Sequence, residues 1–438
     1  MAKKSYWNAS KKSWEHCSKM NIVIAGYDVE GRSSYAYFQR KFPDAQLTIV
    51  DERELSDVPA GAEVHTGAGV FSDQFYDVDM VVRTAGLPPS RIKTSGTIWS
   101  ATNEFFEQCP APIIGVTGTK GKGTTCSLIT SILRAAGKTV HLVGNIGVPS
   151  LDVLPQIQPD DIVVYELSSF QLWDLEKSPH VAVVLMIEPD HLDRHDGFAD
   201  YLDAKSHIAT FQTAQDVIIY NRNNQFSQQI AAKSPARQLS YPIDLSPDMQ
   251  HALKLPGAHN QENASAAVLV AKTVVPELSD DVICQGLAGF TGLPHRLKFV
   301  AEKREVKFYD DSISTTPGSA VAALRSFQQP KVMLLGGADK GGDYTELAEE
   351  LARSQSLRGV IVSGGNADNI AKALQKAGLP DATIVQKGVI PMTEVVWHAL
   401  DIAQPGDVVI LSPAAASFDQ YANYTARGEA FVEAVAEL

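Results

Sequence analysis

Short runs of hydrophobic, mostly β-branched residues recur along the chain, and each ends in glycine or polar residues before a stretch with helical spacing. The clearest runs are Asn21–Ala25, Leu47–Val50, Met80–Val82, Ile113–Val116, Thr139–Val143, Ile162–Tyr165, Val181–Ile187, Val217–Tyr220, Lys331–Leu335, Val360–Ser363 and Asp407–Leu411. This alternation predicts an α/β fold. Because the runs are almost continuously hydrophobic, we expect strands covered by helices on both faces, in mostly parallel sheets.

Two stretches rich in turn-forming residues divide the chain. Cys109–Pro112 precedes a new strand, and Gly289–Pro294 follows a helical pattern. A length of 438 residues suggests about three domains at roughly 150 residues each. We therefore expect domains at 1–110, 111–293 and 294–438, with residues 1–20 as a frayed, basic extension.

Composition narrows the class of protein. With 44% hydrophobic and 20% charged residues, the chain has the composition of a folded globular protein, and its four cysteines form no CxxC pair. The net charge of −13 disfavours nucleic acid as a partner. No signal-peptide core precedes Met20, and the hydrophobic run Val181–Ile187 is too short to span a bilayer. We expect a cytoplasmic protein without membrane insertion.

A glycine-rich loop between a strand and a helix carries the most specific signal. It reads Gly118, Thr119, Lys120, Gly121, Lys122, Gly123, Thr124 and Thr125. Glycines let backbone N–H groups turn toward phosphate oxygens, the helix N-terminus adds partial positive charge, and Lys122 can neutralise the terminal phosphates. Gly123 interrupts the usual spacing between lysine and hydroxyl, so either Thr124 or Thr125 would face Mg²⁺. The loop predicts binding of ATP or another nucleoside triphosphate.

A second, weaker glycine loop lies near the N-terminus. Gly26 and Gly31 follow the first hydrophobic run, and the second run ends at Asp51. Asp28 stands where a dinucleotide fingerprint has its second glycine, so a dinucleotide is disfavoured. The loop suits a nucleotide diphosphate with Asp51 on the ribose or base, and a purely structural turn is the alternative.

Polar residues follow two of the central hydrophobic runs. Glu166 ends the run from Ile162, at the strand end where a Mg²⁺ ligand beside a phosphate loop would lie. His191 lies in an acidic cluster after Val181–Ile187, and it is a candidate metal ligand or substrate contact. His195, in the same cluster, is expected to be structural.

The order of these motifs resembles that of the Mur ligase family. The resemblance rests on the glycine loop, Gly144–Gly147, Glu166–Gln171, Asp190–Arg194 with Lys205, His259-Asn260 with Asn263, Gly292–Arg296, and Leu411–Ser417 with Asp419-Gln420 and Arg427-Gly428. It runs through all three segments. Among the branches of the family, the pattern is most similar to the one that adds glutamate to a UDP-N-acetylmuramoyl-alanine acceptor.

The resemblance implies a fold and an activity. It implies a Rossmann-like N-terminal domain for UDP, a central phosphate-loop domain for ATP, and a Rossmann-like C-terminal domain for the amino acid. Such enzymes make peptidoglycan precursors: ATP phosphorylates a carboxylate, and an amine attacks the acyl phosphate. The expected substrates are UDP-N-acetylmuramoyl-L-alanine and glutamate, D-glutamate being favoured, and the expected state is a monomer.

The resemblance also assigns roles to residues. Lys122 would steady the transferred phosphoryl group, Thr124 with Glu166 would hold one Mg²⁺, and His191 a second, bridged by a carbamylated Lys205. Asn145 would position the muramoyl substrate. The remaining assignments are Asn260, Asn263, Arg296 and Asp311 for ATP, Gly26, Gly31, Asp51 and Arg53 for UDP, and Thr315, Lys340, Ser417, Phe418 and Tyr424 for glutamate.

One departure keeps alternatives open. Where the family has Asp-Ser-Lys, the chain has Asp311-Ser312-Ile313, so a cation that would face glutamate is missing. A ligase that adds L-glutamate is therefore an alternative. A folylpolyglutamate synthetase is a second, although it lacks the UDP domain that the first segment supplies. A non-ligating, ATP-binding regulatory protein is a third, and retention of Glu166, His191 and Lys205 argues against it.

Overall fold

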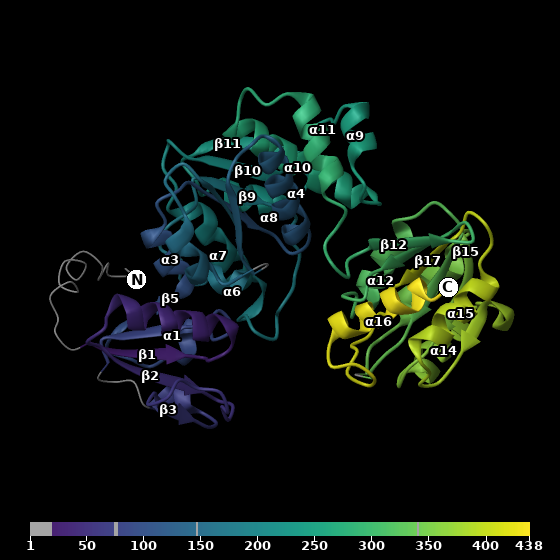
Figure 1. Ribbon diagram of the computed structural model, residues 1–438, viewed down its shortest axis with the longest axis horizontal. Helices are drawn as coiled ribbons and strands as arrows, with labels where there is room; N and C mark the ends of the chain where they lie inside the picture. The colour runs from purple at the N-terminus through teal and green to yellow at the C-terminus, as the bar shows by residue number, and fades with distance from the viewer. Residues whose placement is uncertain (1–19, 74–77, 146–147, 340) are drawn as a thin grey trace. The chain divides into compact units, whose positions relative to one another are not determined.

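The computed structural model describes residues 20–73, 78–145, 148–339 and 341–438, and it contains three β-sheets with helices between their strands (Figure 1). The chain divides into two compact units. One unit comprises residues 1–244 and 265–283, and the other comprises residues 245–264 and 284–438. Helix α10 (Ala258–Val274) begins in the second unit and ends in the first.

The N-terminal sheet is drawn in purple and blue in Figure 1. Its five strands pair in parallel in the order β3-β2-β1-β4-β5. They are β1 (Asn21–Ala25), β2 (Gln46–Asp51), β3 (Glu63–Thr66), β4 (Met80–Arg83) and β5 (Thr97–Ser100), with helices α1 (Val29–Lys41), α2 (Val70–Asp73) and α3 (Ala101–Gln108) and a short 3-10 turn at Pro89–Arg91. The Asp28 side chain caps α1, so the segment after Gly26 turns directly into a helix.

The central sheet has six parallel strands in the order β11-β10-β9-β6-β8-β7. They are β6 (Ile113–Thr117), β7 (Val140–Gly144), β8 (Ile162–Glu166), β9 (Val181–Val184), β10 (Val217–Asn221) and β11 (Arg237–Tyr241). The helices are α4 (Lys122–Ala135), α5 (Ser150–Val153), α6 (Ser169–Leu172), α7 (Gly197–Thr210) and α8 (Gln225–Ala231), followed by α9 (Pro247–Ala252), α10 and α11 (Asp280–Gly289), with a 3-10 turn at Leu154–Gln156.

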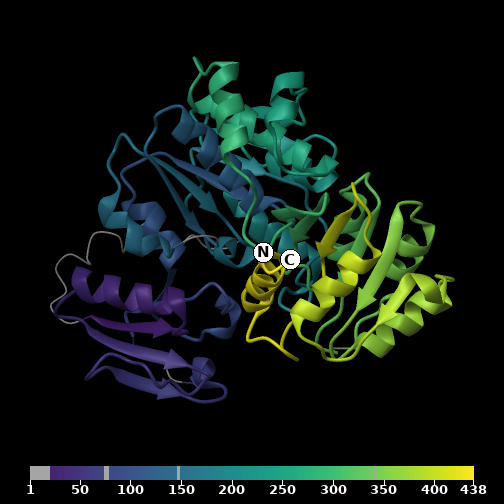
Figure 2. The same cartoon turned by 45° about the vertical axis from the view of Figure 1, so that its right-hand side comes forward.

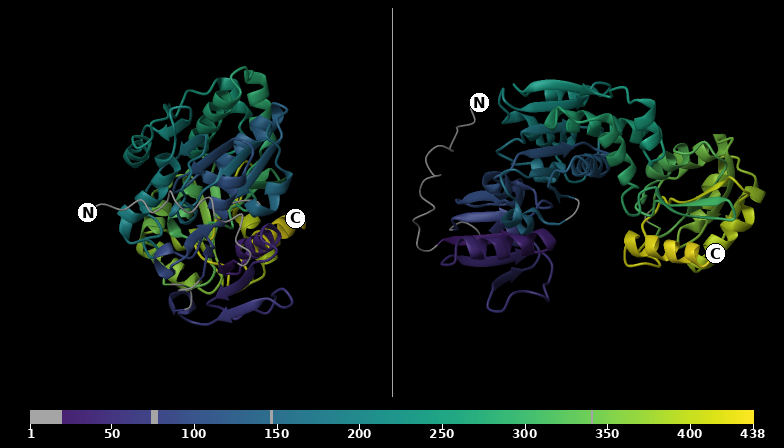
Figure 3. Two further views of the ribbon diagram at one scale, coloured as in Figure 1. Left: turned by 90° about the vertical axis from the view of Figure 1, so that its left-hand side faces the viewer. Right: turned by 45° about the horizontal axis from the view of Figure 1, so that its top comes forward.

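The N-terminal and central sheets share one hydrophobic core. Ile24 and Met80 of the first sheet belong to the same buried cluster as Tyr165 of the second. The Tyr165 ring packs edge-on against Phe105 of α3, with ring centroids 5.3 Å apart. The opposite face of the N-terminal sheet has a smaller core, which includes Val81 and Phe71. The view at the right of Figure 3 shows α1 running alongside β1 and β2.

The C-terminal sheet has the order β12-β13-β17-β14-β15-β16, and β12 is antiparallel to β13 while the other pairs are parallel. Its strands are β12 (Lys298–Lys303), β13 (Val306–Asp310), β14 (Lys331–Leu335), β15 (Leu357–Val362), β16 (Ile384–Gln386) and β17 (Val408–Leu411). Its helices are α12 (Pro317–Arg325), α13 (Thr345–Arg353), α14 (Ala367–Lys376), α15 (Met392–Ile402) and α16 (Tyr424–Ala436), with a 3-10 turn at Asp381–Thr383.

Both faces of the C-terminal sheet are buried. Met333 and Leu335 point into one core with α12, α13 and α14, whereas Val332 and Leu334 point into another with α15 and α16. Figure 2 shows helices on the two sides of this sheet. The alternation explains why the strand is hydrophobic at every position.

The α/β class and the mostly parallel sheets are confirmed. The predicted run Val181–Ile187 is longer than the strand, because β9 ends at Val184. Beyond that residue the amide of Ile187 bonds the Asn224 side chain, and the Met186 carbonyl accepts from the Thr119 amide. Within the described residues, no helix is both long and apolar enough to cross a membrane.

Candidate functional site

The phosphate loop joins β6 to α4, and its glycines adopt conformations that side chains disfavour. Gly118 has φ of 158°, and a Cβ there would lie 2.7 Å from the Cβ of Leu185. Gly121 has φ of 85° and caps the N-terminus of α4. The Lys122 Nζ donates to the carbonyls of Gly118 at 2.9 Å and Thr119 at 3.0 Å. The lysine thus curls over a loop that leads into a helix N-terminus, which is an arrangement suited to phosphates.

The Thr119 hydroxyl is occupied within the protein. It lies 2.8 Å from the hydroxyl of Tyr201 and 3.0 Å from the Glu188 carbonyl, and it also accepts from the Glu188 amide. Lys120, in contrast, is exposed and pairs with the Glu188 carboxylate at 2.6 Å. Thr119 therefore fixes the loop to the segment after β9, and its side chain holds the loop's shape.

Lys205 of α7 lies under the same loop. Only 1% of this residue is exposed, and its Nζ donates to the Gly118 carbonyl at 2.9 Å and to the Thr117 hydroxyl at 3.2 Å. Burial, together with the nearby charge of Lys122, holds the pKa of Lys205 well below its usual range. Within the described part of the chain, no carboxylate lies within ion-pairing distance of this amine.

Glu166 and Asn145 meet at the ends of β8 and β7. The Asn145 side-chain amide donates to the Glu166 carboxylate at 3.1 Å, and its backbone amide donates to the Glu166 carbonyl at 3.0 Å. Gly144 permits this approach, since a Cβ there would lie 2.3 Å from the Glu166 carbonyl oxygen. Glu166 is 5% exposed, so the carboxylate is held at a defined place at this edge of the sheet.

His191 and His195 differ in environment. His191 is half-exposed, has φ of 52°, and has its ring 5.0 Å from that of Phe170. His195 is buried, with its ring nitrogens 2.8 Å from Asp200 and 2.9 Å from the Ser169 hydroxyl. Burial lowers the pKa of His195, although the Asp200 hydrogen bond opposes the shift. These contacts fit the structural role expected for His195 and leave His191 accessible.

These donors fit a magnesium ion that is only partly coordinated by protein. The described residues contain no cluster of three or more His, Cys, Asp and Glu side chains around one point. Mg²⁺ commonly keeps several waters and binds one or two carboxylates together with substrate phosphates. Glu166 and the buried Thr124 near the start of α4 supply that kind of donor set for one ion, and the accessible His191 is a separate candidate ligand.

In the N-terminal sheet, the candidate UDP residues form one polar cluster. The Asp51 carboxylate accepts from the Tyr27 amide at 2.8 Å and the Arg53 amide at 2.9 Å, and the Arg53 guanidinium pairs with it at 3.1 Å. Burial acts to raise the pKa of Asp51, but these donors outweigh burial and hold it below its usual value. Gly26 and Gly31 pack tightly, because a Cβ at Gly31 would lie 2.0 Å from the Gly26 carbonyl oxygen.

The second unit contains the remaining residues that are predicted to bind ATP. The Asn260 side chain donates to the Pro256 carbonyl at 2.6 Å and accepts from the Asn263 side chain at 3.2 Å, while Arg296 is exposed. Asp311 is buried and accepts from the Leu297 amide at 3.1 Å and the hydroxyls of Ser314 and Ser412. Burial raises the pKa of Asp311 to about 6. Its carboxylate is engaged in linking β13 to β17 and the loop before β12.

The candidate glutamate residues occupy the same unit. Thr315, Phe418 and Tyr424 are exposed, Ser417 is buried, and Lys340 lies outside the described residues. Ile313 is partly buried, with its amide bonded to the His295 carbonyl at 3.1 Å.

Arg427 has a structural role that the sequence did not predict, since it was included only in the pair Arg427-Gly428 of the family pattern. Its buried guanidinium donates to the Ser312 hydroxyl and carbonyl at 3.0 and 2.8 Å and to the Ala415 carbonyl at 3.0 Å. Burial lowers its pKa to about 10. It fixes the loops around Ile313 and Ser417, and a buried arginine with such partners has no local sequence signature.

The three α/β sheets and the lysine-bearing phosphate loop define a nucleoside-triphosphate-binding protein with additional Rossmann-like sheets. Residues 116–251 match the Mur ligase middle domain, and residues 295–415 match the Mur ligase glutamate ligase domain. The chain belongs to the Mur ligase family.

Its relatives are similar over most of the chain. It is 36% identical to the UDP-N-acetylmuramoylalanine–D-glutamate ligase of Acetivibrio thermocellus, covering 94% of this chain and 96% of the relative. It is 35% identical to the enzyme of that name from Salinibacter ruber, covering 90% of this chain and 93% of the relative.

Solved structures share the fold at low identity. MurF from Acinetobacter baumannii has a TM-score of 0.59 and 21% identity, covering 96% of this chain and 92% of that one. MurC from Thermotoga maritima has a TM-score of 0.58 and 17% identity, covering 95% and 99%. Folylpolyglutamate synthase from Mycobacterium tuberculosis has a TM-score of 0.58 and 14% identity. The match covers 76% of this chain and 94% of the synthase chain.

Proposed function

We propose that this protein is an ATP-dependent ligase that joins D-glutamate to UDP-N-acetylmuramoyl-L-alanine in peptidoglycan precursor synthesis. One observation carries the proposal: the carbonyl of Gly118 accepts from both Lys122 and Lys205, each at 2.9 Å. The Lys122 ammonium on a phosphate loop suits the transfer of a phosphoryl group between anions, and the buried Lys205 amine lies beside it. The extended similarity to D-glutamate ligases supports the choice of substrates.

The proposed chemistry has two steps. A carboxylate oxygen of the alanine attacks the γ-phosphorus of ATP, ADP leaves, and an acyl phosphate forms. The glutamate amine then attacks the acyl carbon, loses a proton, and expels phosphate to leave the amide. The first step brings two anions together, so the Lys122 ammonium and the N-terminus of α4 stabilise the charge that accumulates on the transferred group.

Magnesium and a modified lysine complete the proposed site. When bound, Mg²⁺ supplies positive charge that offsets the crowding of phosphate and carboxylate oxygens. Thr124 with Glu166 would hold one ion and His191 another. The buried Lys205 amine, whose lowered pKa favours the neutral form, would add to CO₂ with loss of a proton and become a carbamate that serves as a carboxylate ligand.

The other substrates are assigned to the remaining sheets. Asp51 and Arg53 beside Gly26 and Gly31 would hold the uridine diphosphate moiety, and Asn145 the muramoyl substrate. Within the second unit, glutamate would be held by Thr315, Lys340, Ser417, Phe418 and Tyr424. The resemblance to the family assigns Asn260, Asn263, Arg296 and Asp311 to ATP. We also propose the three-domain division at 1–110, 111–293 and 294–438, which rests on the turn-rich stretches of the sequence and on the resemblance to the family.

Phosphate release tests the function. The protein is incubated with ATP, Mg²⁺, UDP-N-acetylmuramoyl-L-alanine and either enantiomer of glutamate, and each component is omitted in turn. We expect phosphate release that requires the acceptor and D-glutamate. Release with L-glutamate alone would contradict the stereochemical assignment. Release without any glutamate would indicate a regulatory ATPase, and release only with a folate acceptor would indicate a folylpolyglutamate synthetase.

Asp51→Asn is expected to weaken the acceptor site. The neutral amide loses the ion pair with Arg53, and hydrogen bonds to a charged group are each worth about 1.5–3 kcal/mol, so the KM for the uridine substrate should rise roughly 10- to 100-fold. The KM for ATP should not change. Asp57→Asn is the matched control, because the exposed Asp57 carboxylate pairs only with Arg32 in the contacts described, at 2.7 Å. Equal effects of the two variants would contradict the role of Asp51.

Ile313→Lys is expected to improve glutamate binding. It restores the cation that the family pattern has, and an exposed ion pair contributes up to about 1 kcal/mol, so the KM for D-glutamate should fall by up to about fivefold. Initial rates at varied glutamate concentration measure this change, with Ile313→Leu as the size-matched control. A KM that is unchanged, or that falls equally in the leucine variant, would show that residue 313 does not face the amino acid.

A further inference from the structure

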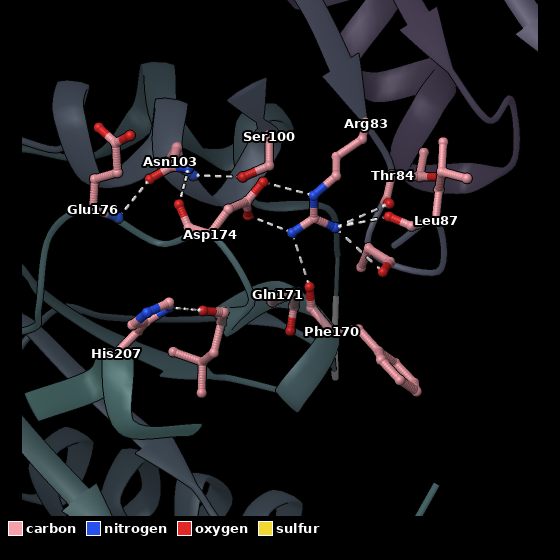
Figure 4. Close-up of polar contacts among 12 residues, drawn as sticks. Arg83, Thr84, Leu87, Ser100, Asn103, Phe170, Gln171, Asp174, Glu176 and His207 are labelled. Carbon is pink, nitrogen blue, oxygen red and sulfur yellow. Dashed lines mark hydrogen bonds and ion pairs between the residues drawn. The ribbon is translucent and has the colours of Figure 1, made fainter. Parts of the chain in front are cut away.

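Arg83, the last residue of β4, has a fully buried side chain that joins two separate segments (Figure 4). Its Nε donates to one carboxylate oxygen of Asp174 at 2.7 Å, and its Nη2 pairs with the other oxygen. The same Nη2 donates to the Phe170 carbonyl at 3.0 Å. The Nη1 faces the carbonyls of Thr84, Ala85 and Leu87 at 3.3–3.4 Å. Every partner is an acceptor, as a guanidinium requires.

The segment beyond Asp174 is held by the neighbouring strand as well. Ser100 ends β5 and caps α3 by accepting from the Asn103 amide at 3.1 Å. The Asn103 side chain then donates to the Asp174 carbonyl at 2.8 Å and accepts from the Glu176 amide at 3.0 Å. The end of β4 and the first turn of α3, which follows the adjacent strand β5 directly, therefore hold the same short segment between β8 and β9.

The segment that Arg83 and Asn103 hold contacts His191, one of the proposed metal ligands. Phe170, whose carbonyl accepts from Arg83, lies in α6, four residues after Glu166. Its ring stacks on His195 at 5.4 Å and lies 5.0 Å from the ring of His191. A displacement of residues 170–174 would therefore move the aromatic surface against which His191 rests.

The loop that Arg83 holds, residues 84–87, contacts the turn at Gly26, which is proposed to bind the uridine diphosphate moiety. The Thr84 hydroxyl donates to the Ala25 carbonyl at 3.2 Å, and a Cβ on Gly26 would lie 2.2 Å from that hydroxyl oxygen. The Ala85 amide donates to the Glu30 carboxylate of α1 at 3.0 Å. Residues 84–87 thus pack against the turn at Gly26 while their carbonyls face Arg83.

We propose that Arg83 and Asp174 are positioning residues that couple the binding of the uridine nucleotide substrate on the N-terminal sheet to the placement of His191 and Glu166. The inference rests on the proposed function for the identity of that substrate. The contact is a bidentate arginine–carboxylate pair in a buried setting, so its geometry is specific, and a lysine cannot reproduce it. Loosening the pair frees loop 84–87 and segment 170–174 together.

Kinetic constants of Arg83→Lys and Asp174→Asn test the coupling. We expect the KM for the uridine substrate to rise at least about tenfold and kcat to fall by a similar factor, within the ~5–150-fold range of coupling between sites. The KM for ATP should stay within about twofold, because no described contact joins Arg83 to residues 118–125. A merely structural role would lower the active fraction and leave both KM values unchanged, which would overturn the proposal.

Arg358→Lys is the matched control. Arg358 and Asp407 form the same bidentate pair in the second unit, at 2.9 and 3.1 Å, near the starts of β15 and β17. This variant should reduce thermal stability without changing either KM. If it changes the uridine substrate KM as much as Arg83→Lys does, the effect is general loosening and the proposal is wrong.

Hydrogen exchange gives a readout that does not depend on turnover. In Asp174→Asn, amide exchange should accelerate in residues 84–87 as well as in residues 170–176, since the carboxylate no longer orients Arg83. Unchanged exchange in residues 84–87 would overturn the coupling even if the wild-type protein proves inactive as a ligase. A wild-type protein without glutamate-dependent phosphate release, but with the expected exchange pattern, would contradict the proposed function alone.

Discussion

Lys122→Met should abolish most ligase activity while leaving the fold intact. Removal of one preorganised charge donor from a site where negative charge accumulates costs about 3–4 kcal/mol in the transition state, so kcat should fall roughly 100- to 1,000-fold. The unbranched methionine side chain can retain the helical conformation at the start of α4. Steady-state phosphate release at saturating substrates measures the loss, and far-ultraviolet circular dichroism verifies the fold.

Lys138→Met is the control for this change. Lys138 is exposed and lies just beyond the C-terminal end of the same helix α4, so its replacement should leave kcat unchanged. If Lys122→Met retained more than about a tenth of wild-type kcat, Lys122 would not be stabilising the transferred phosphoryl group.

Lys205→Ala should be similarly inactive and partly rescued by small carboxylates. The variant removes the side chain that would become a carbamate and leaves a buried gap beside Gly118 and Thr117. Formate or acetate can enter such a gap and supply carboxylate oxygens. We expect a loss of at least about 100-fold in kcat, of the size seen when a group stabilising transition-state charge is lost, and a several-fold recovery at millimolar acetate.

Lys233→Ala serves as the control, because Lys233 also contacts α7, through the Ser206 hydroxyl at 2.9 Å, but its side chain is half-exposed. It should retain wild-type activity and show no response to acetate. Wild-type turnover in Lys205→Ala, or inactivity without any rescue, would contradict the carbamate.

Much of the fold could be predicted from hydrophobic runs, and five of the six strands that were missed share a physical property. β3, β5, β11, β12 and β16 are all edge strands, and their partly exposed faces carry polar residues that interrupt a hydrophobic run. β13 was missed because its burial alternates. β7 is the one edge strand with a clear run.

Site residues that belong to a local sequence motif could be predicted, whereas those whose partners are distant in the sequence could not. The phosphate loop could be found because its glycines and lysines lie close together in the sequence. The structure places Lys205, 88 residues after Thr117, beneath this loop. Arg83 could not be found, because its partners at 170 and 174 are distant in sequence and a single arginine at a strand end is unremarkable there. Thr119 is predicted to bind ATP as part of the phosphate loop, and in the structure its hydroxyl contacts Tyr201 and Glu188.

Isotope transfer tests the central claim most directly. UDP-N-acetylmuramoyl-L-alanine labelled with ¹⁸O in the alanine carboxylate is converted with unlabelled ATP and D-glutamate, and the released phosphate is examined by ³¹P nuclear magnetic resonance. If the carboxylate attacks the γ-phosphorus, each phosphate carries one oxygen from the acceptor, and the shifted resonance grows with product. Peptide formation accompanied by unlabelled phosphate would contradict the acyl phosphate.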